Sequence, residues 1–344
     1  MAPDSAPTSA LRDARPDLSS GAGGLQIPAA ERATSRSEAT PESENDAALP
    51  GPDKGATSGT PGLLRNLISL TKPRLSALVL VTAGGGLWLS DAAPGWVASV
   101  AAVVGTTMVV GGANALNCYI ERDTDRLMAR TARRPLPMGQ MRPEVALLFG
   151  LFLSAVSVPM LSLMTTPLAG LLAAVALVSY VLVYTPLKRR SSISTLIGAL
   201  PGALPPLIGW TAATGRLDAG GLVLFAILFI WQIPHSLAIG IYRQKEYESA
   251  GLVVFPTEHG LEATRRQMLL YAMPLAPLPL ALVHLGVAGP ITAVGGSLLG
   301  AVFLAMCWDG FRNARGAKWA RKTFLASLVY LTALFAVLAV DQWV

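Results

Sequence analysis

One amide and two carboxylates stand four residues apart at the end of a long apolar run. On a helix, Asn117, Glu121 and Asp125 would share one face over about 12 Å. Two acidic groups one turn apart repel each other unless a cation lies between them. Mg²⁺ takes oxygen ligands and commonly shares them with substrate phosphates. The spacing therefore predicts a metal–diphosphate site.

Basic residues follow this face directly. The segment after the acids contains Arg126, Arg130, Arg133 and Arg134, and arginine grips phosphate oxygens through paired hydrogen bonds. A second reading is that the acids form a solvated helix end and the arginines only set membrane orientation. The shared face, and a second basic–acidic segment later in the chain, favour the site.

That second segment also closes an apolar stretch. Its Ile-x-Arg-x-x-Glu pattern, ending at Glu246, echoes the Ile-x-Arg-x-x-Asp pattern that ends at Asp125. If the two helix ends face each other, Glu246 completes an oxygen shell with Glu121 and Asp125. Alone, Glu246 would be an ordinary surface acid.

Two further features carry candidate chemistry. His235 follows Pro234 at membrane depth, where polar side chains are costly and often functional. It could bond a neighbouring helix, contact a porphyrin or accept a proton. Lys188 and Arg189 are candidate phosphate contacts, although membrane topology alone could explain them. The glycines and prolines at 198–210 predict irregular backbone that lines a cavity and allows close backbone approach.

The composition indicates an integral membrane protein. The chain of 344 residues is 52% hydrophobic and only 14% charged, and its apolar residues fall in runs of membrane-spanning length. Cys118 and Cys307 suggest neither a disulfide framework nor a zinc site. The net charge of +6 comes from loops, so we expect no nucleic-acid partner. Motifs for ATP binding are missing, which argues against an ATP-driven pump.

The chain divides into two parts. Residues 1–60 are predicted to be a disordered tail, because they hold too few large apolar residues to form a core. Residues 61–344 are predicted to be an all-α transmembrane domain with nine spans, at about 75–90, 96–118, 145–163, 166–184, 194–212, 221–241, 267–285, 288–307 and 324–341. Basic loops alternate with neutral ones, which places the N-terminus and both acid-bearing loops in the cytoplasm.

The motif Asn117-x-x-x-Glu121-x-x-x-Asp125 resembles the first acidic motif of the UbiA superfamily of intramembrane prenyltransferases. Together with the runs at 71–74, 128–136, 184–189 and 231–235, it resembles the branch of that superfamily that farnesylates haem. The resemblance covers roughly residues 65–340. It implies nine helices around a central cavity, in a bacterial inner membrane with the active site on the cytoplasmic side.

The resemblance also implies a reaction and roles for residues. A farnesyl group would pass from farnesyl diphosphate to a vinyl group of haem B, with Mg²⁺, to give haem O. The implied roles are catalysis by Asn117, Glu121 and Asp125; metal binding by Glu121, Asp125 and Glu246; diphosphate binding by Arg130, Arg134, Lys188 and Arg189; and haem contact by His235 and Tyr184. The product would serve terminal oxidases, and a haem A synthase or another oxidase-assembly protein is a candidate partner.

Two other functions stay open at this point. A prenyltransferase of the same superfamily could act on a quinone precursor or a chlorophyllide. A secondary transporter for an anionic metabolite would account for the echoed segments and the basic loops, but it predicts charges near the bilayer midplane. The acids here gather at one end of their helices.

Overall fold

The computed structural model describes residues 60–343, and within that range it contains helices and no strands. The predicted all-α class is confirmed. The predicted tail, 1–60, lies outside these residues except for its last position. The helices are α1 (Thr60–Leu70), α2 (Pro73–Trp88), α3 (Trp96–Asp125), α4 (Pro143–Met164), α5 (Pro167–Val178), the π-helix η1 (Ser179–Tyr184), α6 (Thr185–Leu187), α7 (Ser194–Thr214), α8 (Ala219–Tyr242), α9 (Gln244–Ser249), α10 (Phe255–Ala272), the 3₁₀ turn η2 (Met273–Leu275), α11 (Leu278–His284), α12 (Pro290–Arg312) and α13 (Ala317–Asp341).

Eight helical stretches within residues 60–343 are long and apolar enough to cross a membrane. One of them combines α5, η1 and α6, and another combines α10, η2 and α11. The sequence predicted nine spans. The remaining candidate, α2, has 16 residues and is shorter than the eight candidate spans.

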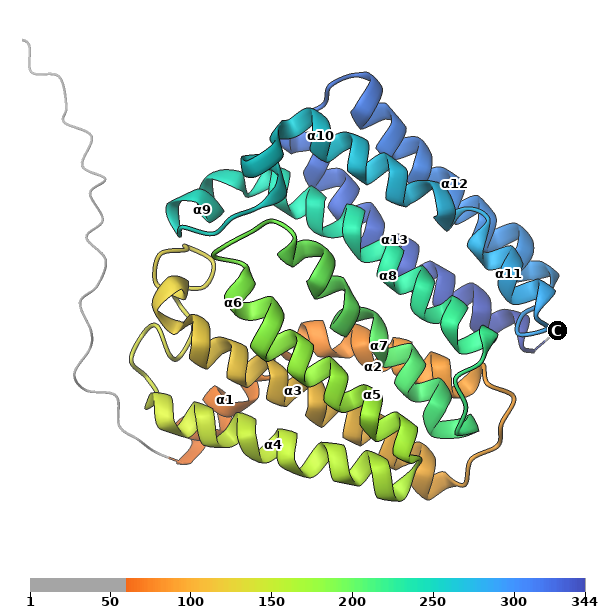
Figure 1. Ribbon diagram of the computed structural model, residues 1–344, viewed down its shortest axis with the longest axis horizontal. Helices are drawn as coiled ribbons and strands as arrows, with labels where there is room; N and C mark the ends of the chain where they lie inside the picture. Colours follow the sequence, from red (N-terminus) through yellow and green to blue (C-terminus); the bar gives the residue numbers. More distant parts are fainter. Residues whose placement is uncertain (1–59, 344) are drawn as a thin grey trace, which may run out of the picture. The chain divides into compact units, whose positions relative to one another are not determined.

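Helix α7 lies among the other helices. It packs against α2, α3, α5 and α8, while α3 runs along α4 and α12 along α13 (Figure 1). Of the apolar window of α7, 67% is buried, against 44% or less for the other candidate spans. Its residues must therefore fit neighbours on nearly every side, which explains its small and rigid side chains.

The proline-rich segment does not break the helix, contrary to the sequence-based expectation. Pro201, Pro205 and Pro206 all lie inside the continuous helix α7 and are buried. Prolines are tolerated in membrane helices where neighbouring helices and local adjustments satisfy the freed carbonyl groups. The surrounding packing therefore outweighs the local preference of proline to end a helix.

The predicted close approach of backbones is present between α2 and α7. A Cβ atom at Gly86 would lie 1.9 Å from the Pro206 carbonyl oxygen, and one at Gly209 would lie 1.9 Å from the Ala83 carbonyl oxygen. Only glycine fits at either position. Two glycines facing opposite helices thus let the backbones of α2 and α7 pack closely.

Helix α3 extends further than the apolar pattern alone predicts. It continues to Asp125, so the face carrying Asn117, Glu121 and Asp125 stays helical to its end. Turns follow from Arg126 to Arg142. The π-helix η1 is followed by α6 and then by Lys188, and π-turns often occur at functional sites.

Candidate active site

The predicted polar face of α3 is buried. Asn117, Glu121 and Asp125 are 1%, 8% and 1% exposed. Carboxylates seldom become this buried without a partner, so the alternative of a freely solvated helix end is excluded for Glu121 and Asp125. Asp123, on another face of the helix, is the solvated acid of this segment, with a side chain 68% exposed.

Each member of this face meets a basic side chain from another part of the chain. Lys188 Nζ lies 2.8 Å from Glu121 Oε1, and Arg134 Nη1 lies 2.6 Å from Asp125 Oδ2. Lys72 Nζ donates to Asn117 Oδ1 at 2.9 Å. These pairs offset the cost of removing the carboxylates from water. The structure thus brings predicted residues Arg134 and Lys188 to the predicted acids.

Lys188 contacts the ring of Tyr184 as well as the carboxylate of Glu121. Its ammonium lies 4.4 Å above the centre of the Tyr184 ring, and a Cβ atom at Gly198 would come within 2.5 Å of that ring. Burial alone would lower the pKa of Lys188, but Tyr184 and Glu121 outweigh it and hold that pKa above its usual range. Lys188 therefore stays charged. Tyr184 lies beside this cation, and its predicted contact with haem stays a prediction.

Two other predicted phosphate contacts lie further out. The side chains of Arg130 and Arg189 are exposed. Arg189 donates to the hydroxyl of Thr124, one residue before Asp125, so it stays close to the α3 end. The guanidinium of Arg130 is free to reach a ligand, while its backbone N–H donates to Glu246 Oε1 at 3.2 Å.

Glu246 does not join the other two acids. Its Oε2 lies 2.5 Å from Arg243 Nη1, and its Oε1 accepts from the Arg130 backbone. Burial alone would raise the pKa of Glu246, but the hydrogen bonds from Arg243 and Arg130 outweigh it and lower that pKa below its usual range. In this arrangement Glu246 ties α9 to the turns after α3. Its predicted metal role stays a prediction.

The acids of α3 nevertheless suit a hard cation. Within residues 60–343, no group of three His, Cys, Asp or Glu side chains is placed to hold a metal ion. Mg²⁺, however, is usually held by one or two carboxylates together with substrate phosphates. Asp125 Oδ1 is buried without a hydrogen-bond partner in the part of the chain that the structure describes, and such an oxygen calls for a bound ion or water. Glu121 and Asp125 therefore fit Mg²⁺ without Glu246.

Lys72 is the site residue that the sequence argument did not assign. Its backbone is left-handed, with φ 52° and ψ 61°, which is uncommon for a residue other than glycine. This conformation begins α2 and turns the lysine toward Asn117. The signal for it was the position of Lys72 directly before Pro73, since that proline starts a helix. Thr185 was also missed; its hydroxyl accepts from Asn117 Nδ2 at 3.2 Å.

His235 contacts a neighbouring helix. Its Nδ1 lies 2.7 Å from the hydroxyl oxygen of Ser327 on α13. The first of the three readings of this histidine is thus confirmed. The bond uses only one ring nitrogen, so contact with a porphyrin and proton acceptance remain compatible with it.

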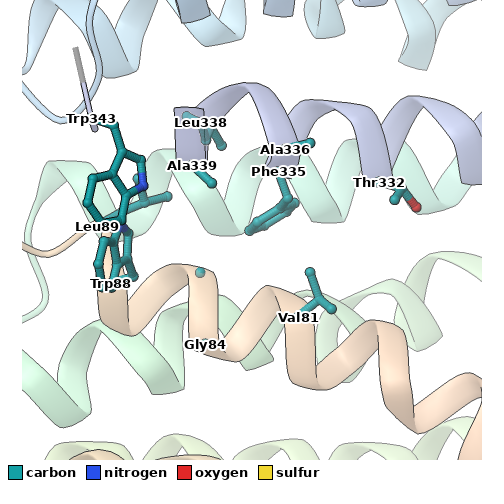
Figure 2. A pocket seen from close by; sticks show the side chains of 11 residues that line it. Val81, Gly84, Trp88, Leu89, Thr332, Phe335, Ala336, Leu338, Ala339 and Trp343 are labelled. Atoms are coloured by element: carbon teal, nitrogen blue, oxygen red, sulfur yellow. The ribbon is translucent and has the colours of Figure 1, made fainter. Parts of the chain in front are cut away.

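An apolar groove lies elsewhere, between α2 and α13 (Figure 2). Its volume is about 420 Å³. At one end the rings of Trp88 and Trp343 lie 6.0 Å apart, and Val81, Gly84 and Phe335 line its length. None of the polar residues on the α3 face lines it, so we do not place the chemistry there.

The described residues thus form a membrane-spanning type of helical fold, with acids and bases buried together at the end of α3. Residues 78–328 match the UbiA prenyltransferase family, and the chain belongs to that family. It is 52% identical over 282 residues to the protoheme IX farnesyltransferase of Myxococcus xanthus, covering 82% of this chain and 96% of that relative. It is 54% identical over 239 residues to the protoheme IX farnesyltransferase of Sorangium cellulosum, covering 70% and 85%.

Solved structures share the fold. A UbiA homologue from Aeropyrum pernix superposes with a TM-score of 0.63 at 22% identity, covering 78% of this chain and 98% of that one. A UbiA homologue from Archaeoglobus fulgidus, solved with DMAPP and Mg²⁺, gives a TM-score of 0.58 at 16% identity, covering 80% and 99%. At these identities the likeness concerns the fold alone.

Proposed function

We propose that this protein transfers the farnesyl group of farnesyl diphosphate to a vinyl group of haem B and so forms haem O. The observation that carries the proposal is the buried network in which Glu121 and Asp125 of α3 each meet a base from another segment. Relatives at 50% identity or more along most of their length are protoheme IX farnesyltransferases, which supports haem as the acceptor.

The network suits departure of a diphosphate. As the allylic carbon–oxygen bond breaks, negative charge grows on the leaving oxygens, and preorganised cations stabilise it. Arg134 and Lys188 can turn from the carboxylates to the phosphates. Both carboxylates then become free to bind Mg²⁺. When bound by Glu121 and Asp125, Mg²⁺ supplies Lewis-acid stabilisation of the leaving group. Arg130 and Arg189 provide further positive charge around it, and Lys72 Nζ provides a hydrogen-bond donor.

The second step of the reaction takes place on the haem acceptor. The haem vinyl carbon forms a bond to the farnesyl carbon that loses diphosphate, and the adjacent carbon adds water and releases a proton to give the hydroxyethylfarnesyl group. The farnesyl chain and the carbocation need surroundings without bulk water. We place the farnesyl chain among the apolar helices that pack against α3.

The proposal includes an orientation. With α2 counted as a crossing, nine spans place the N-terminus and the basic turns after α3 on the cytoplasmic side of a bacterial inner membrane, and the C-terminus on the other side. The basic residues that follow α3, α6, α8 and α12 support this arrangement. Partnership with a haem A synthase stays a prediction.

The test is a reconstituted reaction. The purified full-length protein in lipid nanodiscs, given haem B, farnesyl diphosphate and Mg²⁺, should yield a product with the mass of haem O. Parallel reactions should replace haem with an aromatic acid or a chlorophyllide. Prenylation of one of those acceptors without haem O would contradict the proposal, and so would uptake of an anion into liposomes without any prenyl transfer.

A further inference from the structure

Ser327 of α13 contacts two side chains of α8. The two helices pack against each other (Figure 1). The Trp231 indole donates to the Ser327 carbonyl oxygen at 2.8 Å, and His235 Nδ1 lies 2.7 Å from the Ser327 hydroxyl oxygen. Ser327 is fully buried. One residue of α13 therefore engages both polar rings of α8.

The hydrogen bonds around this hydroxyl decide which histidine nitrogen carries the proton. Ser327 Oγ also lies 2.6 Å from the carbonyl oxygen of Phe324. A carbonyl oxygen only accepts, and a hydroxyl has one hydrogen to give. If that hydrogen pointed at His235, two acceptor oxygens would face each other at 2.6 Å with no proton between them. Both short contacts are hydrogen bonds only when Ser327 donates to Phe324 and His235 Nδ1–H donates to Ser327.

The other ring nitrogen is left open. His235 Nε2 has no hydrogen-bond partner within residues 60–343. It is not one of the fully buried polar atoms of that range that lack a partner. The ring is also restrained, since its centre lies 4.8 Å from that of Trp231 and 5.0 Å from that of Phe324. Nε2 is thus an unprotonated and oriented acceptor that the described residues do not bury completely, inside a membrane-spanning helix, where polar groups are usually functional.

We infer that Ser327 is a positioning residue, which holds His235 as the Nδ1–H tautomer and so presents the lone pair of Nε2 to the haem substrate. This inference rests on the proposed function. Ring nitrogens that bind metal commonly owe their tautomer to a hydrogen bond at the opposite nitrogen. Nε2 can accordingly coordinate the haem iron while Ser327 retains the Nδ1 proton.

The test compares two serine variants. Ser327→Ala removes the hydroxyl but keeps the carbonyl that Trp231 uses, so the packing of α8 on α13 should persist. Ser157→Ala is the matched control, because Ser157 is equally buried and its hydroxyl bonds only Ser154 of its own helix, α4. The chain has three histidines, so ¹⁵N-histidine spectra of the full-length protein, with His235→Gln for assignment, resolve the tautomer directly.

In the wild type we expect a protonated Nδ1 and an unprotonated Nε2 at His235. Ser327→Ala should lose that preference and weaken haem binding, titrated through the Soret band, by about tenfold or more. Binding of farnesyl diphosphate and the melting temperature should match Ser157→Ala. Ser327→Thr, which keeps a hydroxyl, should recover haem affinity if it melts as the wild type does.

Three results would overturn the inference. A wild-type His235 protonated at Nε2 would contradict the tautomer, and equal haem affinity in Ser327→Ala and Ser157→Ala would remove the positioning role, even if the wild type makes haem O. A wild type that binds no haem and makes no haem O would overturn the proposed function and the haem part of the inference with it. The tautomer spectrum would then still report on Ser327 by itself.

Discussion

Arg134 Nη1 lies 2.6 Å from Asp125 Oδ2, while the second carboxylate oxygen, Oδ1, is buried without a partner among residues 60–343. One oxygen of Asp125 is thus neutralised within the protein and the other is available. A buried carboxylate oxygen without a hydrogen-bond partner lowers the stability of the fold. Such a cost is expected where the oxygen has a function. The same asymmetry makes Asp125 the most informative residue to change.

Asp125→Asn should lower farnesyl transfer by about 1,000-fold or more, because it removes the charge that would hold Mg²⁺ against the diphosphate. The protein should still fold and insert. Asp123→Asn is the control, since Asp123 lies two residues away with a side chain 68% exposed, and it should keep near-normal activity. Haem O formation by both variants, measured by mass, checks the prediction; an active Asp125→Asn enzyme would exclude this residue from the metal site.

Lys188→Met should destabilise the protein by about 3 kcal/mol, because it leaves the Glu121 carboxylate buried and unpaired. Adding Glu121→Gln should restore most of that stability, since no charge is then left unpaired. The double variant should nevertheless be inactive, as it lacks both a phosphate contact and a metal ligand. Thermal unfolding in detergent together with a transfer assay separates the two effects. Equal stability of the single and double variants would show that the pair matters little to folding.

Lys72→Gly should separate the effect of the backbone conformation from that of the side-chain amine. Glycine adopts the left-handed backbone of this position without strain, so the variant should melt at or above the wild-type temperature. It should raise the KM for farnesyl diphosphate by about tenfold or more, because a hydrogen-bond donor is lost beside Asn117. Lys72→Met, which loses the amine and keeps the backbone strain, should show the same KM but lower stability. An unchanged KM in both would remove Lys72 from the site.

Chelation of Mg²⁺ with EDTA should stop transfer and leave the fold intact. Lys188 and Arg134 lie within salt-bridge distance of Glu121 and Asp125, so these bases can neutralise the carboxylates when the ion leaves. The melting temperature should therefore change little, and added Mg²⁺ should restore activity. A large drop in melting temperature on chelation would indicate instead a structural metal.

The hydrogen bond that joins the turns after α3 to Glu246 of α9 should weaken at acidic pH. The pKa of Glu246 is lowered in the folded protein from its ordinary value of 4.5, so its contribution to stability is complete above that value and is lost as pH falls through the lowered pKa. Hydrogen exchange of the Arg130 amide should accelerate over this acidic range relative to other amides. Glu246→Gln should remove that pH dependence, and its persistence in the variant would implicate another group.

Local pattern was enough to predict much of this protein. The positions of Asn117, Glu121 and Asp125 on one face follow from the 3.6-residue period of a helix, and long apolar runs predict membrane helices because bilayer thickness sets their length. The proline-rich helix α7 shows where local pattern fails. Its prolines were read as breaks, but burial against α2, α3, α5 and α8 keeps it continuous.

Pairings across the chain were beyond local pattern. Lys188 and Glu121 are 67 residues apart, and the echo between the two acidic segments suggested that Glu246 would join Glu121. The tertiary structure instead places Glu246 with Arg243 and the Arg130 amide. Which base meets which acid depends on how whole helices pack, and no short stretch of sequence contains that information.

The amino-acid sequence by itself determined the helical class, the membrane location and the polar face of α3, since each depends on residue types at short spacing. Only the tertiary structure decided that Lys72 reaches Asn117, that Asp125 keeps one oxygen free, and that Ser327 meets His235. The physical reason is that helix periodicity acts over a few residues, whereas these contacts arise where separate helices pack together.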